Sequence, residues 1–157
     1  MRIGSGVVTA TLIDTNVLVY AYDHAEPRKQ RRALQVLDEL AGSGEGRLSA
    51  QVLSEFFVAV TRRIPAPLSG DEARTRLAHF AQVWPVVPVT AEVVLEAVRG
   101  VERYGFSFWD GQIWAAARLS GAGVVLSEDF NSGAVIEGVQ FVDPFAGNRG
   151  GDHGGSH

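Results

Sequence analysis

Very short apolar runs alternate with helix-length segments along this chain, and this alternation constrains the fold more than any other feature. Five runs have the character of strands: residues 11–13, 47–48, 86–89, 124–126 and 139–142. Strands that alternate with helices pair in parallel, because each helix carries the chain back across the sheet. The run 124–126 is wholly apolar, which is typical of a strand buried on both faces. The pattern predicts an α/β sandwich with a largely parallel sheet.

Residues that favour helix starts and stops mark the segments between these strands. Thr15 or Asn16 is expected to cap a helix through residue 20, and Ser69 with Glu72 forms a capping-box pattern that opens another. Further helices are expected over residues 27–41, 49–63, 90–104 and 107–120.

The length of 157 residues suits one domain, which we assign to residues 1–146. Residues 147–157 are rich in Gly and His and are expected to form a disordered tail. The chain has no cysteine, which excludes disulfides, thiolate zinc sites and cysteine nucleophiles. No apolar run is long enough to cross a membrane and the first residues do not resemble a signal peptide. We therefore expect a cytoplasmic protein that does not contact membranes.

The net charge of −4 argues against a protein that coats nucleic acid electrostatically. It is compatible with an enzyme that gathers acidic residues around metal ions. Of the 14 basic residues, only Lys29 is not an arginine. Arginine suits phosphate recognition, although a codon bias explains the count equally well.

Acidic residues follow two of the expected strands at their carboxyl ends. Asp14 comes directly after the run 11–13, and the pair Glu128–Asp129 comes shortly after the run 124–126. Ligands of open parallel sheets bind beyond these ends, so the acids are candidates for a functional site. Asp14 could equally cap the helix that follows it, and either Glu128 or Asp129 could point inward.

Two further acids lie on helices that lead towards the same sheet edge. Glu55 falls at the edge of an apolar arc, and Asp110 falls inside an apolar face. The arc consists of Val52, Phe56, Phe57, Ala59 and Val60, and the face of Trp109, Ile113, Trp114, Ala116 and Ala117. Burying an ionised carboxylate is costly unless a cation or hydrogen bonds compensate it. Asp110 could also serve only as a capping partner of Ser107.

Convergence of the four acids would create strong mutual repulsion, which is tolerable around cations. Hard oxygen ligands without Cys or a well-placed His favour Mg²⁺ or Mn²⁺. We expect such an ion between Asp14, Asp110 and Asp129, with Glu55 as a further ligand or directly beside them. A site of this kind positions phosphates and activates water for attack on a phosphodiester.

Four stretches of the chain resemble the motifs of the PIN domain: 12–16, 54–56, 108–110 and 126–130. Their order and spacing are similar to those of bacterial VapC toxins, the ribonuclease halves of VapBC toxin–antitoxin pairs. The likeness runs from about Leu12 to Phe145. It implies an α/β/α sandwich with a central, mainly parallel five-stranded sheet and Mg²⁺- or Mn²⁺-dependent endoribonuclease activity. It also implies a homodimer and inhibition by a cognate antitoxin.

The resemblance assigns roles to residues by position. Asp14, Glu55, Asp110 and Asp129 match the acidic site of the family, and Thr15, Asn16 and Ser127 match the polar positions that steady it. Gly111 stands where Ala is more usual in the family, which bears on the local geometry of its helix and not on Asp110 itself.

Other functions fit the sequence less well. A dehalogenase-type phosphatase needs a second Asp where this chain has Asn16, and a receiver domain needs a Lys at a late strand end, whereas Lys29 lies early. Two alternatives within the same fold stay open: a PIN nuclease of RNA processing outside a toxin pair, and a catalytically silent PIN-fold binding protein.

Basic and aromatic residues supply candidates for substrate and partner contacts. Arg28 and Arg32 near the start of one helix, and Arg62 and Arg63 at the end of the helix that carries Glu55, could guide RNA phosphates or simply face solvent. Aromatic residues near the acids exceed what two helices need for packing, so some are expected to anchor a second copy or an antitoxin. These are Phe56, Phe57, Phe106, Phe108, Trp109 and Trp114.

Overall fold

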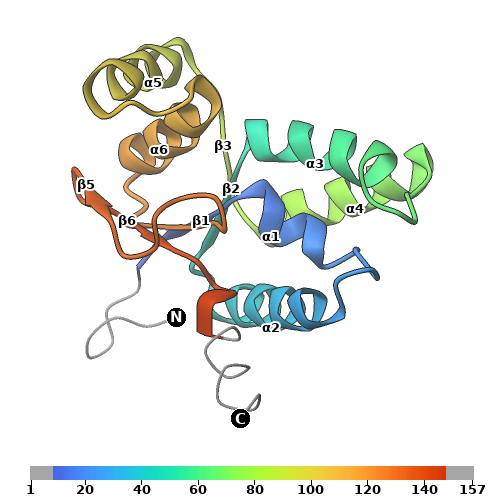
Figure 1. Ribbon diagram of the computed structural model, residues 1–157. Coiled ribbons are helices and arrows are strands. Elements are labelled where there is room, and N and C mark those ends of the chain that lie inside the picture. The colour runs from blue at the N-terminus through green and yellow to red at the C-terminus, as the bar shows by residue number, and fades with distance from the viewer. Residues whose placement is uncertain (1–8, 148–157) are drawn as a thin grey trace.

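The computed structural model describes residues 9–147, in which helices cover both sides of a central sheet (Figure 1). The strands are β1 (Thr11–Ile13), β2 (Gly46–Ser49), β3 (Val86–Val87), β4 (Val124–Leu126), β5 (Val135–Ile136) and β6 (Val139–Val142). Their order in the sheet is β3-β2-β1-β4-β6-β5. Every pair is parallel except β5 with β6. The predicted α/β sandwich with a mainly parallel sheet is confirmed.

The strands differ from the prediction in two places. The sheet has six strands and not five, because the chain turns back at Glu137 and Gly138 and adds the two-residue strand β5 antiparallel to β6. Both turn residues have positive φ angles, 50° and 83°, as tight hairpin turns require. The third strand ends at Val87 and not at residue 89, since Pro88 has no N–H to donate to a neighbouring strand.

Six helices connect and follow the strands in the described residues, and all six begin close to the predicted positions. They are α1 (Thr15–Tyr20), α2 (Pro27–Ser43), α3 (Ala50–Arg62), α4 (Gly70–Val83), α5 (Ala91–Tyr104) and α6 (Phe108–Ser120). Ser49, Ser69, Thr90 and Ser107 cap their helices, and Glu72 completes the capping box. The cap of α1 is not Thr15 or Asn16 but Asp14, the alternative raised for this residue, and its carboxylate accepts a hydrogen bond from the Thr15 N–H.

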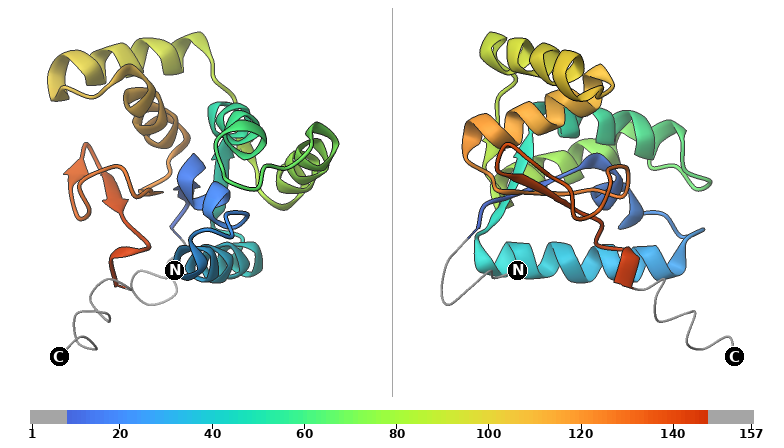
Figure 2. Two further views of the ribbon diagram at one scale, coloured as in Figure 1. Left: turned by 45° about the vertical axis from the view of Figure 1, so that its right-hand side comes forward. Right: turned by 60° about the vertical axis from the view of Figure 1, so that its left-hand side comes forward.

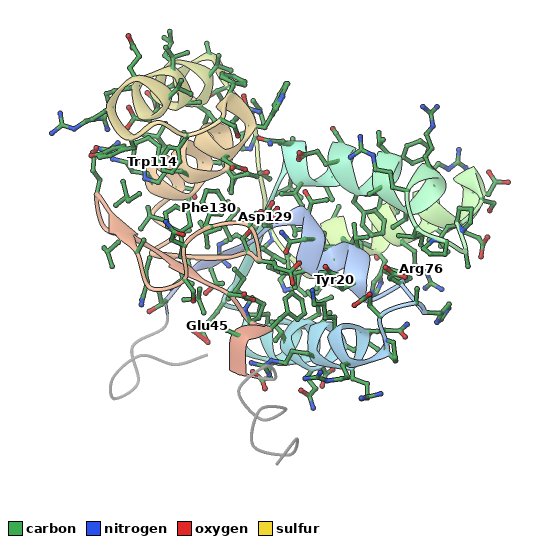
Figure 3. The ribbon with its side chains drawn as sticks, in the orientation of Figure 1. Tyr20, Glu45, Arg76, Trp114, Asp129 and Phe130 are labelled. Atoms are coloured by element: carbon green, nitrogen blue, oxygen red, sulfur yellow. The ribbon has the colours of Figure 1, made fainter. Side chains whose placement is uncertain are left out.

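Helices α5 and α6 lie together on one side of the sheet, whereas α2 lies on the other (Figures 1 and 2). Two glycines allow α5 and α6 to approach closely. A Cβ atom on Gly100 would stand 2.9 Å from the ring of Trp114, and one on Gly111 would stand 3.0 Å from the Ala97 carbonyl oxygen. The unusual Gly111 is therefore explained by helix packing. Trp114 itself lies between these helices and the β5–β6 hairpin, where its indole N–H donates to the Ile136 carbonyl (Figure 3).

The central strands β1 and β4 are buried along their whole length, which places the core around them. Within the part of the chain that the structure describes, no helix is both long and apolar enough to span a membrane. The predicted tail, apart from Gly147, lies outside the described residues.

Candidate functional site

The candidate site forms where the chain order of the sheet reverses, between β1 and β4. Ile13 and Leu126 are register partners in these strands, so the residues that follow them, Asp14 and Ser127, lie side by side. From β1 the chain adds strands on one side through β2 and β3, and then returns to add β4 on the other. Crevices at such a switch point are the usual ligand sites of open parallel sheets.

Asp14 is a buried carboxylate at this point, with 6% of its surface exposed. One oxygen accepts a hydrogen bond from the Thr15 N–H at 2.7 Å, and the other accepts from the Ser127 hydroxyl at 2.7 Å. Burial raises the pKa of Asp14 to about 6, although both hydrogen bonds act to lower it, and the charges of Asp129 and Glu55 add to the increase. The two alternatives considered for Asp14, a cap of the following helix and a position at the crevice beyond the strand ends, coexist in the structure.

Asn16 joins the two strand ends through its side-chain amide. Its Nδ2 donates to the Ser127 hydroxyl at 3.2 Å and to Asp129 Oδ2 at 3.0 Å, and its Oδ1 accepts from the Glu128 N–H at 3.2 Å. The Ser127 hydroxyl in turn accepts from the Asp129 N–H at 3.1 Å. These bonds fix the loop after β4 relative to α1, and Figure 3 shows Asp129 beside that helix.

The structure decides which member of the Glu128–Asp129 pair faces the site. Glu128 accepts a hydrogen bond from the Tyr20 hydroxyl at 2.7 Å and forms an ion pair with Lys29 at 2.5 Å. Its charge is therefore compensated by α1 and α2. Asp129 instead lines a cavity of about 390 Å³.

All four predicted acids line this one cavity, which we call the acid pocket. Asp14 and Asp129 reach it from the strand ends, Glu55 from α3 and Asp110 from the first turn of α6. Thr15 and Asn16 line it as well. The Thr15 hydroxyl lies 3.5 Å from Glu55 Oε2, at the limit for a hydrogen bond.

The apolar face predicted for α6 is wrong at one residue. Ile113, Trp114, Ala116 and Ala117 are buried, but Trp109 is 61% exposed and lines the acid pocket. It is the second residue of the helix. Asp110, the next residue, is half-buried, and burial together with the charge of Asp129 raises its pKa against the hydrogen bond from Ser107. The predicted arc on α3 fails similarly at Phe57, which is exposed.

Two buried glutamines beside the acids escaped the sequence analysis. Gln112 on α6 donates to Gln51 Oε1 on α3 at 2.8 Å. Gln51 Nε2 donates to the Trp109 carbonyl at 3.1 Å and lies 3.4 Å from Glu55 Oε2. The pair thus connects α3 to the first turn of α6. The one signal in the sequence is that Gln51 precedes Glu55 by four residues and so shares its helix face.

The four candidate arginines have different surroundings. Arg63 lines the acid pocket, whereas Arg62, its neighbour, is exposed and is not part of the pocket lining. Arg28 is exposed at the start of α2. Arg32 donates from Nε to the Pro144 carbonyl at 2.8 Å and so ties α2 to the segment after β6.

The donors of the acid pocket suit a hard divalent cation. They are carboxylate oxygens, and the pKa of Asp14 is raised mainly by burial, with a smaller contribution from the charges of Asp129 and Glu55. Within residues 9–147, no three acidic or His side chains are grouped closely enough to hold an ion as they lie. Each oxygen of Asp14 accepts one hydrogen bond, which leaves it a lone pair for a cation. Shared ligation of one ion therefore requires the acids to move closer together.

A comparison with protein families decides the classification. The model of the PIN domain matches residues 11–134, which include all four acids. The chain belongs to the PIN domain family. No curated protein matches it significantly in a sequence comparison.

Solved structures of toxin–antitoxin proteins share the fold of this PIN domain. A toxin–antitoxin complex from Klebsiella pneumoniae superposes with a TM-score of 0.64 at 18% identity, over 86% of this chain and 98% of the other. VapC20 of Mycobacterium tuberculosis, a sarcin–ricin-loop-cleaving toxin, gives 0.61 at 23% identity, over 83% and 99%. VapBC2 of Rickettsia felis, bound to a promoter DNA fragment, gives 0.58 at 16% identity, over 84% and 96%.

Proposed function

We propose that this PIN domain is a metal-dependent endoribonuclease and the toxin of a toxin–antitoxin pair. The observation that carries the proposal is the acid pocket, in which the four predicted acids, from four separate segments, line one cavity at the switch point of the sheet together with Asp23. The fold shared with VapC20, which cleaves the sarcin–ricin loop, supports RNA as the substrate. We place the activity in the cytoplasm, where bacterial RNA is found.

Asp14, Asp110 and Asp129 would hold Mg²⁺ or Mn²⁺, with Glu55 completing or flanking the set. When bound, such an ion supplies a polarised water and neutralises charge on the scissile phosphate. Asn16 and Ser127 keep Asp14 and Asp129 in place through the hydrogen bonds described above. Arg63, at the edge of the pocket, contacts the RNA backbone and offsets part of the repulsion between phosphates and acids.

The partner in this proposal is a small antitoxin, and the chain is expected to form a homodimer. Neighbours of the same fold were solved as toxin–antitoxin complexes. The acid pocket gives a physical route to inhibition: an Arg or Lys from the antitoxin that enters it supplies positive charge without the attacking water.

RNA cleavage by the purified chain tests the function. The protein should cut RNA in Mg²⁺ or Mn²⁺ but not in EDTA, and Asp14→Asn should lower the rate by at least 100-fold. Asp38→Asn is the matched control, since Asp38 is exposed on α2 and does not line the acid pocket. Expression of the wild type alone should arrest growth, and Asp14→Asn should not.

Three results would separate the alternatives. No cleavage by the wild type in either metal would favour the silent binding protein. Cleavage without growth arrest, in the absence of an adjacent antitoxin gene, would favour a nuclease of RNA processing. Equal cleavage by wild type and Asp14→Asn would mean that a contaminating nuclease is being measured.

A further inference from the structure

Trp109 is exposed although this chain buries its other tryptophans. Its side chain is 61% accessible, compared with 5% for Trp84 and none for Trp114. Tryptophan is highly buried on average, so a mostly exposed indole beside a functional cavity calls for a partner outside the chain. Of the six aromatic residues singled out in the sequence, Phe56 and Trp114 belong to the core and Phe106 and Phe108 pack against it. Phe57 is 38% exposed, so Trp109 is the most exposed of the set.

The exposed indole is held in a defined position. Phe108 packs edge-to-face against it, with ring centroids 5.0 Å apart and planes at 81°. The Trp109 carbonyl accepts the hydrogen bond from Gln51 at 3.1 Å, and Gln112 fixes Gln51 from the opposite side. A ring anchored in this way loses little freedom when a flat ligand stacks on it.

Trp109 lines both the acid pocket and a second cavity of about 610 Å³. The two cavities share Gln51, Glu55, Arg63 and Trp109. The second cavity extends from them towards Val58 and Val89 and is the more apolar of the two. We call it the side cavity. A single ligand could thus reach both cavities, with a charged part at the acids and an apolar, flat part against the indole.

We propose that Trp109 is a stacking platform that holds one RNA base in the side cavity, next to the phosphate that lies in the acid pocket. This inference rests on the proposed function and names how the substrate is held. Each nucleotide carries a flat base and an anionic phosphate in covalent connection, and the lining shared by the two cavities includes the Trp109 indole and the Arg63 side chain.

Stacking, and not hydrogen-bond readout, should dominate recognition at this position. The Gln51 amide is already engaged at both ends, since its oxygen accepts from Gln112 and its nitrogen donates to the Trp109 carbonyl. Every base has a π-face, so the site should accept all four bases and should prefer purines for their larger area. Sequence preference of the nuclease must then come from elsewhere on the RNA.

Binding of an oligoribonucleotide that the wild type cleaves tests the proposal. All variants carry Asp14→Asn to prevent cleavage, and binding is followed by fluorescence anisotropy. Trp109→Ala should weaken binding about 5- to 100-fold, and Trp109→Phe should restore most of it. Leu95→Ala is the control, because Leu95 is 70% exposed on α5 and lines neither cavity.

An abasic nucleotide beside the cleavage position distinguishes stacking from a general loss of affinity. Removing that base should weaken binding to the Trp109 protein and have little effect on the Trp109→Ala protein, which is the signature of a direct contact in a double-mutant cycle. An equal loss in both proteins would overturn the proposal.

The remaining outcomes separate this inference from the proposed function. If the wild type cleaves RNA but Trp109→Ala binds RNA normally and loses antitoxin binding, then the ring serves a protein partner and the stacking proposal is wrong while the nuclease stands. If the wild type cleaves no RNA, both the stacking proposal and the proposed nuclease function are contradicted. Thermal melts of each variant verify that the fold is intact.

Discussion

Asp14 has two roles, since its carboxylate caps α1 and contributes negative charge to the acid pocket. The ionised form is disfavoured in the folded chain, where its pKa is about 6 compared with an ordinary value of 3.8 for an aspartate in water. Ionisation therefore destabilises the metal-free protein. The penalty is absent below about pH 4, where the carboxyl is protonated in both states, grows between pH 4 and 6, and is complete above pH 6.

Asp14→Asn should raise the melting temperature in EDTA at pH 7.5. Asn removes the buried charge but keeps an oxygen that can accept the Thr15 hydrogen bond, so the gain is about 1–3 kcal/mol. The gain should vanish near pH 4. Melts from pH 4 to 8 measure it, and a gain that is independent of pH would contradict the account.

Divalent metal should reverse the order of the melting temperatures of the wild type and Asp14→Asn. An ion that binds only the folded state adds about 2.7 kcal/mol at 100 times its dissociation constant. The wild type should gain this stability in Mn²⁺, whereas Asp14→Asn should gain little. A wild type that melts at the same temperature with and without Mn²⁺ would count against the proposed metal ligands.

Two adjacent arginines provide a matched test of phosphate guidance. Arg63 lines both cavities and Arg62 lines neither. Arg63→Ala should weaken RNA binding and reduce the slope of log affinity against log salt by about 1, since one phosphate contact is lost. Arg62→Ala should leave the slope within error. Titrations at several salt concentrations measure both, and equal slopes for the two variants would remove Arg63 from the substrate path.

At the scale of elements, the close contact of α5 with α6 positions the acid pocket. Trp109 and Asp110 lie in the first turn of α6, and Gly111, the next residue, faces the Ala97 carbonyl of α5. The hydrogen bond between Gln51 on α3 and Gln112 on α6 further fixes the position of that turn relative to α3. The helix interface therefore determines where one acid and the exposed indole stand.

Gly100→Ala should destabilise the protein, because the added Cβ would stand 2.9 Å from the fully buried ring of Trp114. Overpacking of this kind costs about 1–3 kcal/mol. Gly42→Ala is the control: Gly42 lies in α2 with nothing within 4 Å of the added atom, and its replacement should stabilise by about 0.5–1 kcal/mol. Denaturant unfolding measures the change in the free energy of unfolding for both variants. If Gly100→Ala is stabilised as Gly42→Ala is, the packing between α5 and α6 does not limit the size of the side chain at position 100.

At the scale of the whole molecule, the topology concentrates charge of one sign at one edge of the sheet. Acids from both strand ends and from two helices share the acid pocket, whereas Glu128, the chain neighbour of Asp129, is paired with Lys29. A partner that inhibits the enzyme can use this concentration directly by inserting a cation.

If the proposed antitoxin binds this chain, the complex should bind metal more weakly than the free chain does. If an antitoxin Arg or Lys occupies the acid pocket, Mn²⁺ must displace it, and the apparent affinity should fall at least tenfold. Calorimetric titration of both forms measures the difference. Equal affinities would mean that the antitoxin acts by blocking access of RNA alone.

Local patterns in the sequence were enough to predict most of the fold. The five parallel strands, the caps at Ser49, Ser69, Thr90 and Ser107, and the sandwich class all follow from apolar periodicity and from hydrogen bonds between residues a few positions apart. The two-residue strand β5 was missed because it exists only through pairing across the turn at Glu137 and Gly138. The family motifs likewise led to the four acids that line the acid pocket.

Only the tertiary structure decided how the side chains around those acids are disposed. Glu128 is turned to α1 and α2 by Tyr20 and Lys29, so that Asp129 is left to face the cavity. Trp109, in the first turn of α6, is exposed, although helical periodicity places it on the buried face. Gln51 and Gln112 lie 61 residues apart and have no local signal for their contact. The physical reason is common to all of these residues: side-chain orientation at a strand end or in a first helical turn is set by neighbours that are distant in the chain, which a pattern of nearby residues does not contain.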